Sequence, residues 1–364
     1  MRPAIAVNIQ GAPTRKKLAA ARRTVNSTES LLCCPLCREA LLAESGGFGC
    51  GRCSRTYRRI VGLPDLRVQI PAAFDARKDL YLAELLERQQ ERLSFDELLA
   101  FHYKLNPPAD EGLHARHMAH FQVEGEQAEA ALGELAARWT HPEMEALLDV
   151  GCGLGRYLNA GRARFGIVAG IDLSLAQLVL ARKYLAEAGQ TALLVAAQSE
   201  RLPFRACTFG AAVAADSLEH VGDPAATVSE AARVLRPGGG FFLSTPNRFS
   251  LTAEPHVGVW GLGYWPRSWA IRHVRRKLGV RYDDIRLFSF WGLRRLLRGC
   301  FAGSCEVRLP RVGGREAESF SPLKRRAARL YEALRRLPAL RAGLFAVTPY
   351  FQAVCVKRAA PASD

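Results

Sequence analysis

Two pairs of cysteines near the amino end of the chain have the spacing of a metal site. Cys34 and Cys37 form one CxxC pair, Cys50 and Cys53 form the second, and twelve residues separate the pairs. Four thiolates in two such pairs are typical of tetrahedral zinc sites. We therefore expect a structural zinc ion here, because a unit this small lacks the core to fold without added stabilisation. The alternative is a ribbon that has lost its metal.

A glycine-rich turn follows a short apolar stretch in the segment LLDVGCGLGRYL (147–158). Asp149 lies near the tip of the expected strand, and Gly151, Gly153 and Gly155 allow a tight turn against which a ligand can lie. The spacing G-x-G-x-G differs from the G-x-G-x-x-G of pyrophosphate-binding turns, and an acid there suits a cationic ligand without phosphate. Asp172 ends the next expected strand, where a carboxylate can accept both hydroxyls of a ribose.

Three polar residues lie at or just after the end of the expected apolar strand at 210–216. Asp216, Glu219 and His220 are the candidate catalytic residues, and a histidine can take a proton near neutral pH. The alternative is that Glu219 and His220 cap the strand and pack on the next helix.

Apolar strands and amphipathic helices alternate from residue 146 onward. The expected strands are 146–150, 166–172, 192–197, 210–216, 239–245, 303–309 and 348–357. The expected helices include 174–189, 224–239, 289–299 and 321–337. This alternation predicts an α/β fold, with a Rossmann-like seven-stranded, mostly parallel sheet and helices on both faces.

Several of these segments together resemble the motifs of class I S-adenosylmethionine-dependent methyltransferases of the type 11 kind. The segments are LLDVGCGLG, GIDLS (170–174), AAQSERLPF (196–204), DSLEHVGDP (216–224) and RVLRPGGGFFLSTPN (233–247). The resemblance implies S-adenosylmethionine as cofactor, with Asp149 and the three glycines around its methionine end and Asp172 on its ribose. It further implies that Leu173, Gln198 and Leu202 lie on the adenine side. Gln198 departs from the family, which often has Asp there, although a Gln carbonyl could still accept from the adenine amino group.

The segment after the expected strand at 210–216, where the methyl acceptor would bind, has a second resemblance. The segment with Asp216, Glu219 and His220 is similar to that of ubiquinone-biosynthesis O-methyltransferases, where an acid and a Glu-His pair can hold a divalent metal. No Asp/Asn-Pro-Pro-aromatic motif follows the fourth strand, which argues weakly against methylation of adenine N6.

The chain divides into several expected parts. They are a basic flexible arm (1–30), a zinc ribbon (31–70), a helical linker or cap (71–145), the methyltransferase domain (146–357) and a tail (358–364). Within the domain, an insertion (246–288) is expected on the acceptor side, and a basic helix at 321–337. The insertion's His256, Trp260, Tyr264, Trp265 and Arg267 could orient a ring or a sugar, or could simply pack as a lid.

The amino-terminal unit, CPLCREAL…GCGRCSRTYRRIVGLPDL, resembles the zinc-ribbon domain of the activator subunit of tRNA methyltransferases. This resemblance implies a ribbon that docks on the methyltransferase domain or holds an acceptor or partner. His114, His117 and His120 follow three-residue spacing and could bind a metal, but successive turns drift around a helix.

Charge is unevenly distributed along the chain. Residues 246–345 contain 21 basic and 7 acidic side chains, a net of +14 out of +16 for the whole chain. This favours an anionic partner, namely a phosphorylated metabolite, RNA or an acidic lipid surface, although an arginine-rich solvated surface would look the same. No run of about 18 apolar residues exists, so no transmembrane segment is expected. The ten cysteines do not suggest a disulfide framework, and a reducing cytoplasm is the expected compartment.

These observations predict a methyltransferase that uses S-adenosylmethionine and carries zinc. The expected acceptor is a hydroxyl of a small-molecule, saccharide or lipid-linked metabolite, with peripheral membrane contact as an option. Methylation of ribosomal or transfer RNA is the alternative, because the basic carboxyl-terminal third could bind the phosphates of the RNA backbone. A non-catalytic binding module with the same fold is a third option, against which the intact glycines and Asp172 argue.

Overall fold

The computed structural model describes residues 28–106, 125–137, 146–301, 303–312, 317 and 320–358. The described residues leave out most of the expected amino-terminal arm and of the carboxyl-terminal tail. They also leave out His114, His117 and His120.

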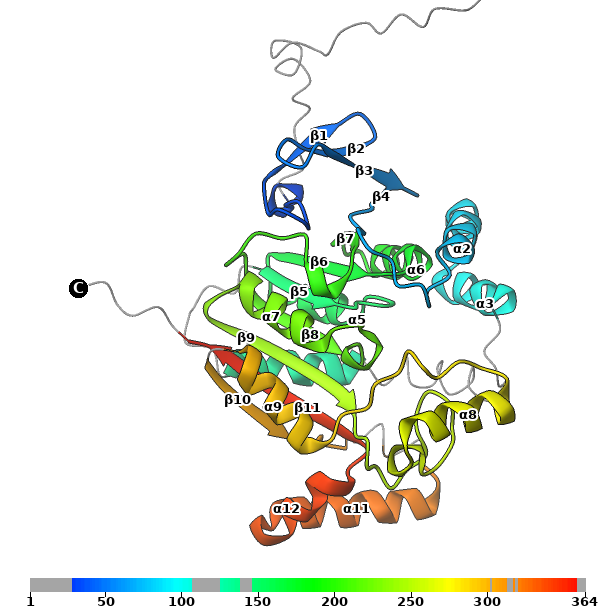
Figure 1. Cartoon of the computed structure of the whole chain (residues 1–364), viewed down its shortest axis with the longest axis vertical. Coiled ribbons are helices and arrows are strands. Elements are labelled where there is room, and N and C mark those ends of the chain that lie inside the picture. The colour runs from blue at the N-terminus through cyan, green and yellow to red at the C-terminus, as the bar shows by residue number, and fades with distance from the viewer. Residues whose placement is uncertain are drawn as a thin grey trace, which may run out of the picture.

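A seven-stranded sheet forms the centre of the molecule (Figure 1). Its order is β10-β11-β9-β8-β5-β6-β7. The strands are β5 (Ala146–Val150), β6 (Ile167–Asp172), β7 (Leu193–Ala196), β8 (Phe209–Ala215), β9 (Leu235–Pro246), β10 (Gly303–Arg308) and β11 (Tyr350–Lys357). The first five are parallel, whereas β11 runs antiparallel between β9 and β10. The predicted α/β class and the mostly parallel sheet are therefore confirmed.

Helices cover both faces of this sheet, which explains why the parallel strands are largely apolar and buried, whereas the edge strand β10 is mostly exposed. Alternate residues of β5 point to opposite sides, so that Leu147 and Leu148 belong to two different cores. The core around Leu147 packs on α5 (Arg156–Gly161) and α6 (Leu175–Glu187). The core around Leu148 packs on α7 (Pro224–Val234) and α9 (Phe290–Cys300). The helix predicted over 224–239 was too long, because Pro237 and the left-handed Gly238 suit the start of β9 better than a helix.

The cysteine-rich segment forms a separate small sheet above the main one (Figure 1). It consists of η1 (Glu29–Leu31) and four antiparallel strands, β1 (Leu41–Glu44), β2 (Gly47–Cys50), β3 (Arg55–Ile60) and β4 (Leu63–Pro64). Bridges from Leu32 to Phe204 and from Asp65 to Ala196 join it to the main domain. Because Phe48 and Leu66 share one core with Phe204, this small sheet and the main domain form one packed body.

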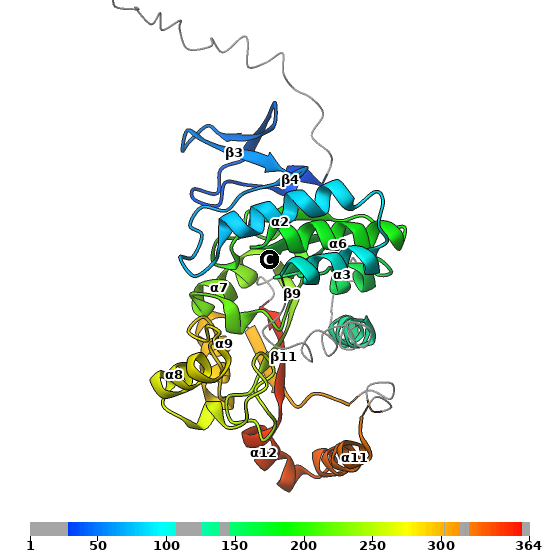
Figure 2. The ribbon, with the colours of Figure 1, turned by 90° about the vertical axis from the view of Figure 1, so that its right-hand side faces the viewer.

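Two helices after the small sheet pack on α6, as Figure 2 shows for α2. They are α2 (Ala76–Gln89), with Asp75 as its N-cap, and α3 (Phe95–Leu105), which begins with a capping box of Ser94 and Glu97. A further helical stretch covers 125–137. The described parts of 71–145, where the sequence predicted a helical linker or cap, thus contain helices.

The segment after β9 contains more structure than the sequence suggested. It includes η4 (Leu262–Tyr264) and α8 (Arg267–Leu278), which form a small core of their own around Val274 and Tyr282. The predicted basic helix is present as α11 (Pro322–Arg336), and α12 (Pro338–Val347) follows it. The sequence analysis missed both α8 and α12, because few of their residues are buried.

Cys305 and Cys355 face each other across β10 and β11 and form a disulfide. The sequence did not indicate this pair, because fifty residues separate the two cysteines and only the strand register brings them together. None of the helices in the described part of the chain combines the length and apolar content needed to cross a bilayer.

Candidate functional site

The glycine turn lies at the carboxyl end of β5 and leads into α5. Gly151, Gly153 and Gly155 have φ angles of +78°, +48° and +83°, which side chains rarely tolerate. A Cβ on Gly151 would lie 2.6 Å from the Cβ of Ser217, whereas one on Gly153 would meet nothing within 4 Å. The turn is therefore closely packed on the Ser217 side and open at Gly153, as a turn that receives a ligand must be.

Asp172, at the end of β6, contacts this turn directly. Its Oδ2 accepts a hydrogen bond from the Gly153 amide at 3.0 Å, and its Oδ1 accepts one from the Ser174 amide at 2.9 Å. Burial raises the pKa of the Asp172 carboxyl above its usual value of 3.8. Asp149 is also buried, one strand away. Two acidic residues of neighbouring strands thus flank the glycine turn, as the sequence predicted.

A third carboxylate, that of Asp79, caps the amino end of α6. Asp79 of α2 accepts from the Ser174 hydroxyl at 2.5 Å and from the Leu175 amide at 2.9 Å. Helix amino ends attract anions, and this one already holds an anion supplied by the chain. The amino end of α6 is therefore already capped by the chain itself.

The segment that leaves the small sheet builds the wall expected on the adenine side. Arg67 donates to the carbonyl of Leu173 at 2.9 Å. The Val68 amide donates to Oε1 of Gln198 at 2.9 Å, and Nε2 of Gln198 donates to the carbonyl of Gln69. The side-chain amide of Gln198 is therefore bonded to the chain itself and supports this wall, and its contact with adenine stays a prediction.

Leu202 differs from the sequence prediction in the same region. Its side chain has no exposed surface and belongs to the core shared with the small sheet. Its carbonyl accepts from Arg38 at 2.7 Å, and its amide donates to Glu230 at 2.8 Å. In this structure Leu202 supports the contact between the small sheet and the main domain. Its contact with a cofactor stays a prediction.

The predicted catalytic residues follow β8 and lie beside the glycine turn. Asp216 has a φ of +47° and accepts from the Ser244 hydroxyl at 2.8 Å. Glu219, in η3 (Leu218–His220), is fully buried, and its Oε2 accepts from the Thr245 hydroxyl at 2.9 Å. The Ser217 hydroxyl donates to the Val150 carbonyl at 2.9 Å, so this segment is joined to the end of β5.

The insertion adds a histidine to this group. Nδ1 of His256 lies 2.5 Å from Oε1 of Glu254, and its Nε2 lies 3.8 Å from Oε1 of Glu219. The rings of His256 and His220 pack edge to face with centroids 4.7 Å apart. The ligand atoms of Glu219, His220 and His256 all lie within 4.8 Å of one another. The sequence analysis named His256 for positioning a ring and missed Glu254, although their E-x-H spacing was visible.

Burial and charge shift the pKa values of this group in different directions. Burial, with a contribution from Asp216, raises the pKa of Glu219 to about 8. Burial would lower the pKa of His256, but the hydrogen bond and charge of Glu254 outweigh it, so that this pKa is raised. Desolvation and the neighbouring His256 lower the pKa of His220 to about 4. The raised pKa values of Glu219 and His256 and the lowered pKa of His220 thus occur in one buried group.

The other insertion residues that the sequence singled out act mainly within the insertion. The Trp260 indole donates to the Leu251 carbonyl at 3.1 Å, and the Tyr264 hydroxyl donates to the Phe249 carbonyl at 2.6 Å. Arg267 donates to two carbonyls of the segment that follows α8. Trp265 packs edge to face on His273. These contacts lie within the insertion while Trp260 and Tyr264 stay exposed, so the lid and the acceptor-orienting roles both stay predictions.

The four cysteines of the paired motif meet at one point. Sγ of Cys34 lies 4.0 Å from Sγ of Cys53, and Sγ of Cys37 lies 3.4 Å from Sγ of Cys50. Tetrahedral ligands at the usual Zn–S distance are about 3.8 Å apart, so these spacings fit zinc. The Tyr57 hydroxyl lies 3.2 Å from Sγ of Cys34 and gives the site an outer hydrogen bond.

Residues 148–243 match a family model described as a methyltransferase domain. This segment contains the glycine turn, Asp172 and the group after β8. Residues 148–243 therefore match a methyltransferase domain, in the part of the chain where the motifs predicted one.

Curated relatives include two ubiquinone biosynthesis O-methyltransferases. The one from Dechloromonas aromatica is 34% identical over 155 residues, which cover 35% of this chain and 66% of the relative. The one from Aromatoleum aromaticum is 42% identical over 103 residues, which cover 28% and 44%. The chain thus spans less than two thirds of either relative. Among solved structures, Haemonchus contortus phosphoethanolamine N-methyltransferase 2 with S-adenosylhomocysteine has a TM-score of 0.43 at 17% identity, over 64% of this chain and 52% of that one.

Proposed function

We propose that the protein transfers a methyl group from S-adenosylmethionine to an oxygen of a small-molecule, saccharide or lipid-linked acceptor. One observation carries the proposal: the glycine turn, bonded to Asp172, packs directly on the segment that holds Glu219 and His220. The curated relatives, which are named O-methyltransferases, support oxygen as the acceptor atom.

The cofactor side of this crevice would be formed by the ends of β5 and β6. The open turn at Gly153 lets a ligand lie against the backbone, and Asp172 would accept from the ribose hydroxyls in place of its present backbone bonds. Leu173 and the wall built by Gln198 would face the adenine. S-adenosylmethionine supplies a methyl group already activated on a sulfonium, so much of the work of the protein is to position the acceptor.

The acceptor side would be formed by Glu219, His220 and His256. Glu254 orients the imidazole of His256, which leaves Nε2 directed toward Glu219 and able to take the proton of an acceptor hydroxyl. The same three residues also fit a divalent cation, since Oε1 of buried Glu219 has no hydrogen-bond partner among the described residues. A cation held there would supply Lewis-acid activation of the acceptor oxygen.

We infer that Cys34, Cys37, Cys50 and Cys53 bind a structural zinc ion. The small sheet that it would hold together leads directly into the segment that bonds Gln198 and Leu173. Zinc would therefore support the cofactor wall and take no part in methyl transfer.

The test is the transfer of labelled methyl groups from S-adenosylmethionine to separate pools of small metabolites, lipids and RNA. We expect labelled small or lipid-linked products that survive ribonuclease and are absent with the Asp172→Ala protein. Label found only in RNA would contradict the proposed acceptor. A protein that binds the cofactor but labels no pool would contradict the enzymatic activity and favour a binding module.

A further inference from the structure

Figure 2 shows α8, α9, α11 and α12 in the part of the molecule away from the small sheet. These elements combine exposed apolar side chains with a dense positive charge. We call this surface the arginine–tryptophan end, and it consists of α8, the start of α9, α11 and α12. Its large exposed apolar side chains are Trp269 (65%), Trp291 (72%), Leu323 (78%), Leu330 (60%), Leu337 (51%) and Leu340 (49%). A soluble surface rarely exposes so many large apolar side chains together unless they bind something.

Helix α11 has one side attached to the protein and one side without contacts. The Tyr331 hydroxyl donates to the Pro310 carbonyl at 2.8 Å, and Glu332 accepts from the Val312 amide at 3.1 Å, so this side holds the helix in place. Leu323 and Leu330 are seven residues apart and fall on the other side of the helix, and the exposed Leu337 follows its last residue. No residue of α11 or α12 is buried, which leaves this leucine stripe without a partner in the described part of the chain.

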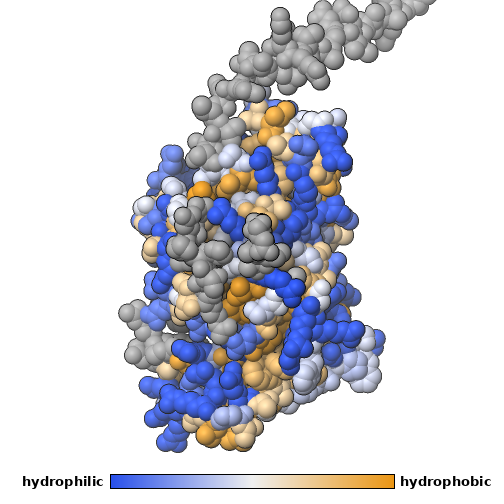
Figure 3. Space-filling view, turned by 90° about the vertical axis from the view of Figure 1, so that its left-hand side faces the viewer, coloured by the Kyte–Doolittle hydropathy of each residue, from blue (hydrophilic) through white to orange (hydrophobic). Residues whose placement is uncertain are grey.

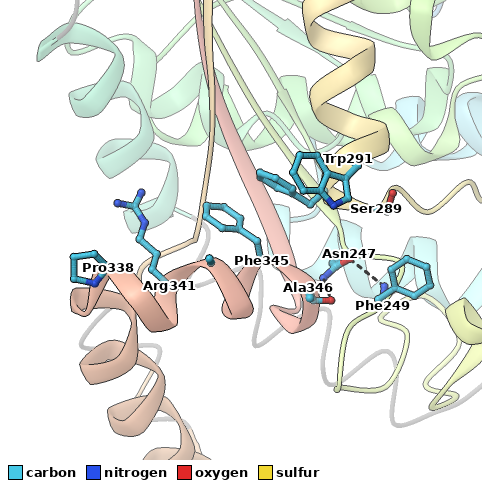
Figure 4. A pocket seen from close by; sticks show the side chains of 10 residues that line it. Asn247, Phe249, Ser289, Trp291, Pro338, Arg341, Phe345 and Ala346 are labelled. Atoms are coloured by element: carbon cyan, nitrogen blue, oxygen red, sulfur yellow. Dashed lines mark hydrogen bonds between the residues drawn. The ribbon is translucent and has the colours of Figure 1, made fainter.

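An apolar hollow of about 600 Å³ lies beside this stripe, between α9 and α12. Phe249, Phe290, Trp291 and Phe345 line it, and Arg341 stands at its edge. Figure 4 shows Trp291 across the hollow from Phe345, with Arg341 on the same side of α12. Figure 3 shows hydrophobic surface next to strongly hydrophilic surface at the end of the molecule where α12 lies.

The charge of this surface is almost entirely of one sign. Helices α8, α9, α11 and α12 carry 15 basic side chains and one acidic side chain, Glu332. A second copy of the chain would bring arginine against arginine, which disfavours a dimer through this surface. Phosphates of RNA would explain the arginines but not the leucine stripe.

We propose that the arginine–tryptophan end docks on an anionic membrane surface. Tryptophan prefers the boundary between lipid chains and headgroups, and an amphipathic helix with arginines beside its apolar face lies in that boundary. Each arginine near an anionic leaflet adds to the attraction. The proposal rests on this surface alone and does not depend on the methyl-transfer activity.

The test is flotation of the full chain with vesicles of phosphatidylcholine, either pure or mixed with phosphatidylglycerol. We expect binding to the mixed vesicles, weakened by salt, and little binding to the pure ones. Replacing Arg325, Arg326 and Arg329 by Gln should weaken binding on the order of 100-fold. Leu323→Ser/Leu330→Ser should also release the protein, and neither change should unfold it because these side chains are exposed.

The matched control removes the same charge elsewhere on the molecule. Arg77, Arg92 and Arg205 are exposed and lie outside the arginine–tryptophan end, and their replacement by Gln should leave vesicle binding nearly unchanged. Equal losses in the two triple variants would overturn the proposal, because charge alone would then explain the binding. Retention of the leucine variant on vesicles would overturn it as well, and so would salt-sensitive binding to RNA without any binding to vesicles.

Discussion

Nε2 of His256 lies 3.8 Å from Oε1 of Glu219, a fully buried oxygen that has no hydrogen-bond partner among the described residues. Thirty-seven positions separate these two residues in the sequence, and the insertion after β9 brings them together. The contact joins the lid to the segment that holds the predicted catalytic residues. Anything that moves the insertion would therefore change the geometry of the acceptor side.

His256 is expected to matter for the reaction rather than for the fold. A His256→Ala protein should lose about 10²- to 10⁴-fold in kcat, the usual contribution of a positioned acid or base. Its affinity for S-adenosylmethionine should stay unchanged, because the cofactor side is formed by other strands. The check is steady-state kinetics alongside calorimetric cofactor binding, with His273→Ala in α8 as the control. An unchanged kcat would show that His256 only packs.

Removal of divalent ions tests whether the Glu219, His220 and His256 group holds a cation. We expect a chelator to lower methyl transfer and added Mg²⁺ or Mn²⁺ to restore it, while a Glu219→Gln protein should respond to neither. Full activity after exhaustive chelation would leave His256, oriented by Glu254, as the group that activates the acceptor. Zinc content should be followed in parallel, so that loss of the ribbon metal is not mistaken for this effect.

Asp172 should control cofactor affinity. Replacing it by Ala removes charged hydrogen bonds to the ribose and the present bond to Gly153, so affinity should fall at least about tenfold. Calorimetry with S-adenosylhomocysteine measures this directly. Asp96→Ala, which removes an exposed carboxylate from the first turn of α3, is the matched control and should bind normally. Equal affinity in both variants would remove Asp172 from the site.

The features that local sequence determines were predictable. Strand β5 has the same bounds in the structure as in the prediction, because a buried parallel strand is a short apolar run closed by a glycine turn. The four ribbon cysteines were found because ligand spacing in two CxxC pairs is itself a local pattern. Asp172 was found in the same way, at the end of an apolar strand.

The features that depend on distant contacts were not predictable. The amide of Gln198 is taken by residues 68 and 69, about 130 positions away, and no pattern near Gln198 indicates this. Helix α8 buries only Ala270 and Val274, too few to give a clear helical period. The contact between Glu254, His256 and Glu219 depends on how the insertion folds back, which spacing alone does not determine.

Loss of the ribbon metal should weaken the cofactor site as well as the fold. Cys50→Ser/Cys53→Ser should lose zinc by elemental analysis and lower the Tm, by about 2 °C or less for each kcal/mol lost, because the chain is longer than 250 residues. Cofactor affinity should also fall, because the segment after the ribbon bonds Gln198 and Leu173. Cys207→Ser, at an exposed cysteine outside the cluster, is the control. Zinc retained by the double variant would contradict the assignment.

His102 should make the protein less stable in mild acid. The residue is buried in α3, its Nδ1 has no hydrogen-bond partner among the described residues, and burial lowers its pKa below the usual 6.5. Below pH 6.5, His102 is therefore protonated in the unfolded chain but still neutral in the folded chain. The free energy of unfolding should therefore fall as the pH drops below 6.5, by at most about 1.4 kcal/mol per pH unit from this residue, until the lowered pKa is reached.

The measurement compares urea unfolding of the wild-type and His102→Phe proteins between neutral pH and pH 5. Phe keeps an apolar ring in the core but cannot titrate, so the variant should lose this part of the acid sensitivity. Carboxylates that titrate in the same range contribute to both proteins and cancel in the difference. A difference in unfolding free energy that stays constant across the whole pH range would show that His102 is protonated as easily in the folded chain as in the unfolded one.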